Sequence, residues 1–151
     1  MDPRPAQPAP RPSRQERLLM ALVKAAELFK RRSSAVFREY GLSFSQYNAL
    51  RVLAGEPEGE ASLGQIGRSM LASGPNLSGI ARRLEEGGFV RRRGGEGDQR
   101  LRLLKITAEG RRVLEAIAGR QEANVRGLLE PYSQREQELM RRMLRDMLRR
   151  A

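Results

Sequence analysis

The order of patterns between residues 62 and 106 constrains the fold more than any other feature of this sequence. After a segment at 55–61 that is interpreted as an acidic loop, Ser62 and Gln65 form a capping box that opens a short amphipathic helix. The sequence SGP at 73–75 separates it from a second short helix. One face of this second helix is apolar and carries Leu77, Ile80, Ala81 and Leu84. Two short helices joined by a tight break predict a helix-turn-helix.

The clearest β-strand signals follow directly after these two helices. The basic runs FVRRR (89–93) and LRLLKI (101–106) flank the Gly-rich sequence GGEGDQR (94–100), which is too long for a two-residue turn. We interpret this pattern as a hairpin with an extended tip. A helix-turn-helix followed by a hairpin is a winged helix. Its second helix can enter the major groove of DNA, and its hairpin, the wing, can reach the adjacent minor groove.

Helical patterns occupy most of the remaining chain of 151 residues. Residues 1–12 contain five of the eight prolines and predict a flexible tail. Long amphipathic helices are predicted over about 13–40 and about 108–150. The predicted fold is therefore mainly α with a small β-hairpin wing. We expect a single domain over 13–151, in which a winged-helix lobe at about 43–107 is flanked by long N- and C-terminal helices.

The composition excludes several classes of protein. Cysteine and histidine are both absent, which rules out disulfides, thiol chemistry, Ser-His-Asp triads and nearly every zinc or haem site. No nucleophile–base constellation can be assembled, because Glu56 and Glu58 lie in a polar segment without apolar shielding. We therefore expect no enzyme activity, no metal and no cofactor. The sequence also contains no apolar run near the ~18 residues of a membrane span and no secretory signal, so we expect a cytoplasmic protein without membrane contact.

The charge favours a polyanionic partner. Lys and Arg total 29 against 18 acidic residues, which gives a formal net charge of +11. Double-stranded DNA is the first candidate and an anionic membrane surface the second. A bias of the genome toward Arg codons is an alternative explanation, since only three of the basic residues are lysines. The location of the charge supports DNA, because residues 62–106 alone contain nine Lys and Arg against four acids.

The residues of the second helix and the hairpin suit DNA recognition. Asparagine pairs with adenine edges, arginine binds guanine or phosphate, and helix N-terminal amides attract a phosphate. The predicted DNA contacts are Ser73, Asn76, Ser78, Gly79, Arg82, Arg83, Arg92 and Arg100. Asp98 is predicted to pair with Arg100 or Arg102 and so to support the tip of the wing. The alternatives are that 91–93 is a solvated strand end and that Asn76 only satisfies the start of its helix.

Several of these segments together resemble the MarR family of bacterial transcriptional regulators. The matching pieces are LSFSQYNALRVL (42–53), SLGQIGRSM (62–70), NLSGIARRLEEGGFVRR (76–92), DQR (98–100) and ITAEG (106–110). The resemblance implies that Asn76, Ser78, Gly79 and Arg82 lie on the recognition helix. It also implies that Arg100 is the wing arginine placed in the minor groove, supported by Asp98. Gln99 departs from the arginine that is common at its position in the family.

The resemblance further implies a homodimer whose N- and C-terminal helices interlock. Apolar stripes on both long helices support this, since such stripes need burial outside the small lobe. The basic end at 141–150 is interpreted as a solvated face, with phosphate contacts as the alternative. Control by a small aromatic or phenolic effector is also implied. The candidate effector contacts, chosen by position, are Phe29, Arg32, Phe37, Tyr40 and Tyr47, and the alternative is that these side chains are plain core.

The sequence thus predicts a sequence-specific, double-stranded DNA-binding transcriptional regulator. The expected form is a ligand-responsive homodimeric repressor on a pseudo-palindromic operator. The alternative is an architectural DNA-binding protein without an effector, which would bind all duplexes with little preference.

Overall fold

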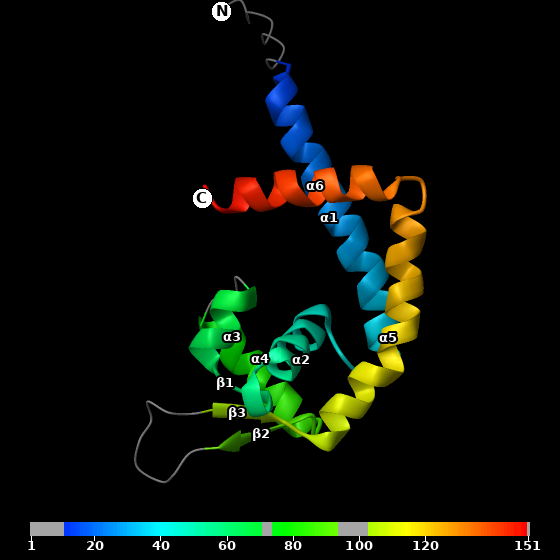
Figure 1. Ribbon diagram of the computed structural model, residues 1–151. Coiled ribbons are helices and arrows are strands. Elements are labelled where there is room, and N and C mark those ends of the chain that lie inside the picture. Colours follow the sequence, from blue (N-terminus) through cyan, green and yellow to red (C-terminus); the bar gives the residue numbers. More distant parts are fainter. Residues whose placement is uncertain (1–10, 71–73, 94–102, 151) are drawn as a thin grey trace, which may run out of the picture.

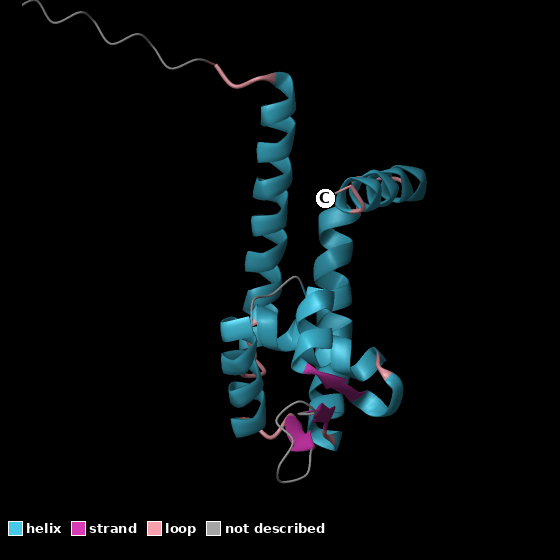
Figure 2. Ribbon diagram, turned by 90° about the vertical axis from the view of Figure 1, so that its left-hand side faces the viewer, coloured by secondary structure: helices cyan, strands magenta, loops and turns pink. Residues whose placement is uncertain are grey.

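The computed structural model describes residues 11–70, 74–93 and 103–150. In chain order their elements are α1 (Arg14–Arg38), α2 (Phe44–Gly55), η1 (Pro57–Gly59), β1 (Glu60–Ser62), α3 (Leu63–Met70), α4 (Gly74–Glu86), β2 (Val90–Arg93), β3 (Leu103–Ile106), α5 (Ala108–Leu129) and α6 (Gln134–Leu148). A lobe of α2, α3, α4 and the sheet forms the lower part of the molecule in Figure 1. Helices α1 and α5 rise from it side by side, and α6 turns away at the far end (Figures 1 and 2). The fold is mainly helical with a small sheet, as predicted.

Serine and threonine side chains begin the helices at the positions that the local sequence predicts. The Ser13 hydroxyl accepts from the Glu16 backbone N–H at 3.1 Å, and Thr107 caps α5 in the same way through Gly110. Full capping boxes pair Ser43 with Gln46, Ser62 with Gln65 and Ser133 with Glu136. Each cap satisfies amide groups that would otherwise lack a partner and contributes about 1 kcal/mol to helix stability.

The sheet has three strands, not the two of the predicted hairpin. The order is β1-β3-β2, and both pairings are antiparallel, with Ala61 opposite Leu104 and Val90 opposite Ile106. The interpretation of 55–61 as a loop was therefore wrong, because this segment contains η1 and most of β1. The strand escaped prediction because it has three residues and only one buried side chain, Ala61, so its sequence carries no alternation. Its pairing with β3 spans more than 40 residues of sequence.

A continuous apolar core fills the lobe and extends to the base of α1 and α5. The predicted inner face of α4 is buried, with Leu84 fully covered. The fully buried large side chains come from α1, α2, α3, α4, α5 and the connection before α2, namely Phe37, Leu42, Leu50, Leu53, Ile66, Leu84 and Ile117. Burial of each such side chain contributes about 1.5–3 kcal/mol to folding. The core therefore fixes α4 and the sheet to the two long helices.

Polar contacts join α1 to α5 above this core. The buried Ser33 hydroxyl accepts from the Gln121 side-chain amide at 3.0 Å and from that of Asn124 at 3.3 Å. Closer to the lobe, both nitrogens of the Arg120 guanidinium end group donate to the Glu39 carboxylate. These bonds lower the pKa of Glu39 and raise that of Arg120. The crossing of α1 and α5 is thus set by specific hydrogen bonds as well as by packing.

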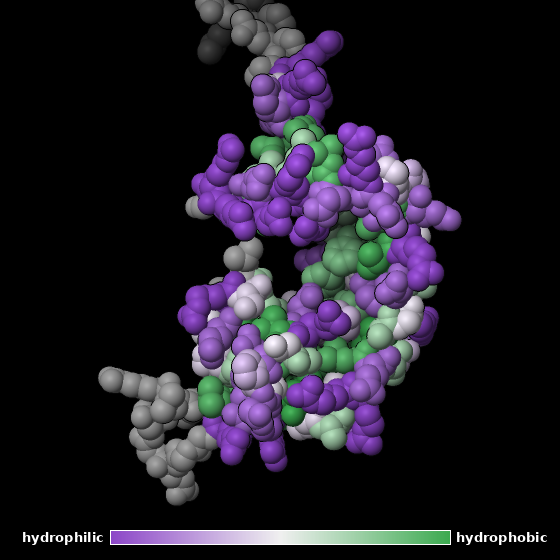
Figure 3. Space-filling model, viewed as in Figure 1, coloured by the Kyte–Doolittle hydropathy of each residue, from purple (hydrophilic) through white to green (hydrophobic). Residues whose placement is uncertain are grey.

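The outer turns of α1 and the whole of α6 leave apolar side chains in solvent. These side chains include Leu18, Leu19, Met20, Val23, Leu139, Met143, Leu144, Met147 and Leu148. Figure 3 shows an apolar patch on the part of α1 that rises above α6 in that view. None of the described helices has both the length and the apolar character needed to cross a membrane.

Candidate nucleic-acid interface

Helix α4 presents a polar and basic face on the outside of the lobe. Leu77, Ile80, Ala81 and Leu84 bury the opposite face against α2 and α3. The predicted contacts on α4 all lie away from this buried face: Asn76, Ser78, Arg82 and Arg83 are exposed, and Gly79 is half-buried. Packing on one side therefore holds the helix while its polar side stays open. This is the arrangement that a recognition helix needs to enter a major groove.

Among the residues that the structure describes, the arginines of α4 have only weak partners. Arg82 lies 3.8 Å from Glu86 one turn further along the helix, and the side chains of both are about two-thirds exposed. Ion pairs of this kind contribute about 0–1 kcal/mol, so Arg82 can exchange Glu86 for a phosphate or a base at little cost. No part of the lobe core covers Arg83, which is also exposed.

Arg92 connects the sheet to the recognition helix. Its Nε donates to the Glu85 carboxylate at 2.9 Å, and about a third of each side chain is exposed. The sequence analysis predicts Arg92 as a DNA contact. The structure gives it a partner on α4, which leaves only its terminal nitrogens for DNA. Ser73, Asp98 and Arg100 lie outside the described residues, so their predicted roles stay predictions.

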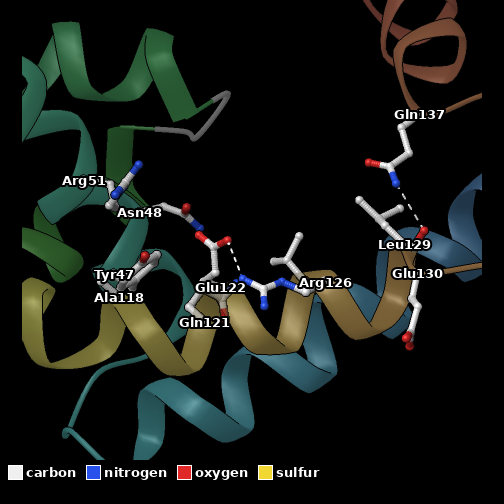
Figure 4. Close-up of a pocket in the computed structure, with 11 residues that line it drawn as sticks. Tyr47, Asn48, Arg51, Ala118, Gln121, Glu122, Arg126, Leu129, Glu130 and Gln137 are labelled. Carbon is white, nitrogen blue, oxygen red and sulfur yellow. Dashed lines mark hydrogen bonds and ion pairs between the residues drawn. The ribbon is translucent and has the colours of Figure 1, made fainter. Parts of the chain in front are cut away.

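A cavity of about 650 Å³ lies between α2 and α5 and reaches the start of α6 (Figure 4). The α2 side of the cavity is formed by Tyr47, Asn48 and Arg51. Figure 4 shows the ion pair between Glu122 and Arg126 on the α5 side, with an N–O distance of 3.1 Å. The remaining lining residues are Ala118, Gln121, Val125, Leu129, Glu130 and Gln137. The lining thus combines apolar surface with groups of both charges.

Among the five predicted effector contacts, only Tyr47 lines this cavity. Phe37 is buried and stacks on Tyr47 with ring centroids 3.8 Å apart. The Tyr40 hydroxyl donates to the Ala116 carbonyl oxygen, Phe29 meets Phe44 edge-on, and Arg32 is exposed on α1. Sequence reasoning named none of the α5 residues that line the cavity. No local pattern marks it, because α2 and α5 lie about 70 residues apart in the chain.

The described residues contain no group of three or more acidic side chains that could hold a metal ion. What they do contain is the helix pair α3 and α4, an antiparallel sheet whose strands β2 and β3 follow this pair, and an open basic face on the second helix. These features define the class of winged helix-turn-helix DNA-binding proteins.

Comparison with known proteins identifies the family within this class. Residues 40–101 match the sequence profile of the MarR family. The chain is 30% identical over 125 residues to the HTH-type transcriptional regulator PecS of Dickeya dadantii, an alignment that covers 82% of this chain and 75% of PecS. The chain belongs to the MarR family, and it is a DNA-binding transcriptional regulator rather than an enzyme.

Solved structures share the whole fold. Sco3205 is a MarR family regulator from Streptomyces coelicolor that was solved in complex with DNA. It superposes on this chain with a TM-score of 0.82 at 24% identity, and the alignment covers 92% of this chain and 90% of the Sco3205 chain. NadR in complex with 4-hydroxyphenylacetate superposes with a TM-score of 0.74 at 25% identity, covering 91% of this chain and 96% of NadR. The long helices are thus part of the shared architecture as well as the lobe.

Proposed function

We propose that the protein is a homodimeric repressor that reads a pseudo-palindromic operator and is released from it by a small aromatic or phenolic ligand. The observation that carries the proposal is the open polar face of α4, which the buried opposite face holds in place. The complex of Sco3205 with DNA supports the same use of the fold here. Two copies related by a two-fold axis would present two α4 helices to half-sites about one helical turn of DNA apart.

Within this proposal the side chains of α4 have different roles. Asn76, Ser78 and Arg82 read base edges, while Arg83 and the amides near Ser73 bind phosphates. Gly79 lets the backbone approach the DNA. In the wing, Arg100 enters the minor groove and Asp98 supports it. Arg92 holds the wing against α4 through Glu85 and adds its terminal nitrogens to the backbone contacts.

Selection of bound duplexes from a random DNA pool tests this assignment. We expect a palindromic consensus. Asn76→Ala should relax one position in each half-site at a cost of about 1–3 kcal/mol in binding free energy. Arg83→Ala should weaken binding to all sequences. It should also reduce the slope of log affinity against log salt concentration by about 0.9, the value for one phosphate contact. If the protein enriches no consensus and random DNA competes equally, it is an architectural DNA-binding protein instead.

The exposed apolar faces of α1 and α6 support the homodimer. Met143 is 60% exposed, and Leu144 next to it is 42% exposed. We expect Met143→Glu to shift a dimer toward monomers in sedimentation at micromolar concentration. Each buried apolar side chain contributes about 1.5–3 kcal/mol, so the dissociation constant should rise by at least about tenfold. Arg142→Glu, on the polar side of the same helix, is the matched control and should leave the dimer intact. A wild-type protein that sediments as a monomer would contradict the proposal.

The cavity between α2 and α5 supports control by a ligand. Its volume of about 650 Å³ falls in the range of sites for small organic molecules. Tyr47 and Val125 offer apolar contact, and Arg51 offers a positive charge. NadR, which shares the fold, was solved with a phenolic acid bound. A ligand that binds more tightly to a dimer with displaced lobes would shift the population away from the DNA-binding state. Addition of phenolic acids to the DNA-binding assay tests this part of the proposal separately.

A further inference from the structure

The outer face of the sheet carries a cluster of charges. Along each strand, successive side chains point to opposite faces. Ala61, Val90, Leu104 and Ile106 form the inner face and are buried in the lobe core. The register places four charged side chains on the outer face, namely Glu60 of β1, Lys105 of β3, and Arg91 and Arg93 of β2. The described residues of this face thus include three positive charges and one carboxylate.

Glu60 holds two of these three cations with a single oxygen atom. Its Oε1 accepts from Lys105 Nζ at 2.8 Å and from Arg93 Nη1 at 2.6 Å. The carboxylate is largely covered, with 15% of its side chain exposed. The bond from Lys105 and the bond from Arg93 together lower its pKa, so Glu60 is charged at neutral pH. The neighbouring strand therefore supplies Arg93 with a fixed ionic anchor.

Lys105 and Arg93, the two cations that share Glu60, differ in how far their side chains are exposed to solvent. The Lys105 side chain is 21% exposed, whereas that of Arg93 is 63% exposed. A guanidinium carries five N–H donors in a rigid plane, and Glu60 accepts from only one of its nitrogens. Within the residues that the structure describes, the other donors of Arg93 have no partner. One carboxylate also cannot neutralise two cations, so the described residues of this face carry a positive surplus, which Arg91 increases.

The sheet is also fixed relative to the recognition helix. Arg92, the residue before Arg93, donates to Glu85 of α4 at 2.9 Å on the inner side of the strand. Val90 of the same strand is buried in the core beside α4. The anchored guanidinium of Arg93 therefore keeps a constant position relative to the helix that enters the DNA.

We propose that Arg93 contacts a phosphate of the DNA backbone from the outer face of the sheet, and that Glu60 is a positioning residue that orients its guanidinium for this contact. Glu60 itself does not touch the DNA. The contact adds affinity without sequence information and helps to fix the register of the protein on the duplex. The inference rests on DNA binding by the family fold and is independent of the operator, the dimer and the effector proposed above.

Binding to a labelled duplex of random sequence tests the role of Arg93. The affinity is measured over a series of salt concentrations, and thermal unfolding of each variant checks that it is folded. We expect Arg93→Ala to weaken binding and to reduce the slope of log affinity against log salt by about 0.9, the value for one phosphate contact. An unchanged slope would show that Arg93 does not reach the DNA and would overturn the proposal. A wild-type protein that binds no duplex would instead overturn DNA binding as such.

Glu60→Gln tests the positioning role against a matched control. Glu58→Gln removes the same charge from an exposed side chain two residues away and reports the effect of charge alone. We expect Glu60→Gln to bind about two- to tenfold more weakly than Glu58→Gln, which is the cost of immobilising one flexible side chain on binding. In the Arg93→Ala background the two variants should bind equally. Two results would contradict the positioning role. One is a difference in DNA affinity between the two variants that persists in the Arg93→Ala background. The other is a Glu60→Gln variant that binds DNA as tightly as Glu58→Gln, or more tightly.

Discussion

Replacement of Phe37 with alanine is expected to lower the free energy of unfolding by about 3–5 kcal/mol. Phe37 is 1% exposed, stacks on Tyr47 at 3.8 Å and lies 6.0 Å from the Phe44 ring. Its removal leaves a cavity at the point where α1, α2 and the lobe core meet. Denaturant unfolding followed by circular dichroism, at one fixed protein concentration, measures the change, since dimerisation would make stability depend on concentration.

Phe29→Ala provides the control for this experiment. It removes the same aromatic ring from the same helix, but Phe29 is 37% exposed, so the loss of stability should be clearly smaller. The comparison also decides between the two interpretations of Phe37 in the sequence analysis. If Phe37→Ala left the stability nearly unchanged and weakened only the response to a phenolic ligand, Phe37 would be an effector contact and not a core residue.

Two glycines of α5 are expected to respond to alanine in opposite directions. A Cβ on Gly110 would overlap with the carbonyl oxygen of Phe89 and would lie 2.8 Å from Ile106 Cγ1. Nothing lies within 4 Å of a Cβ on Gly119, nine residues further along the helix. We expect Gly110→Ala to destabilise the protein by about 1–3 kcal/mol, because backbone atoms must shift. Gly119→Ala should stabilise it by about 0.5–1 kcal/mol, because alanine loses less entropy in a helix.

Thermal unfolding of both variants measures these effects. Since the two substitutions have the same intrinsic helix propensity, the difference between them isolates the close contact of α5 with Phe89. Equal stabilisation of both variants would show that the start of α5 can move away from Phe89, the residue before β2, and that this end of the lobe is more adaptable than its packing indicates.

Local sequence patterns predicted the helices and the orientation of α4. Helix periodicity placed Leu77, Ile80 and Leu84 on a common face, and the structure buries all three. The serine caps at Ser43 and Ser133 were predicted because capping chemistry acts over three residues of sequence. Features of this kind can be predicted because the interacting groups are neighbours in the chain.

Features that depend on distant residues could not be predicted in this way. The strand β1 exists because it pairs with β3, and its ionic contact from Glu60 to Lys105 spans 45 residues. The predicted DNA contact Arg92 has its partner Glu85 only seven residues away, but this contact depends on how β2 packs against α4, which no periodic pattern could indicate. The α5 residues that line the cavity between α2 and α5 were missed for the same reason. In each case the chemistry is ordinary, and the missing information is which segments the fold brings together.

The contacts that hold α1 have a consequence for the order in which the chain acquires its structure during synthesis. Ser33 of α1 bonds to Gln121 and Asn124, which follow it by 88 and 91 residues. The side of α1 that carries Ser33 therefore stays uncovered until α5 has been synthesised, about 90 residues later. A nascent segment of this kind is a natural client for molecular chaperones, and its docking is a late, non-local step that slows folding relative to the lobe.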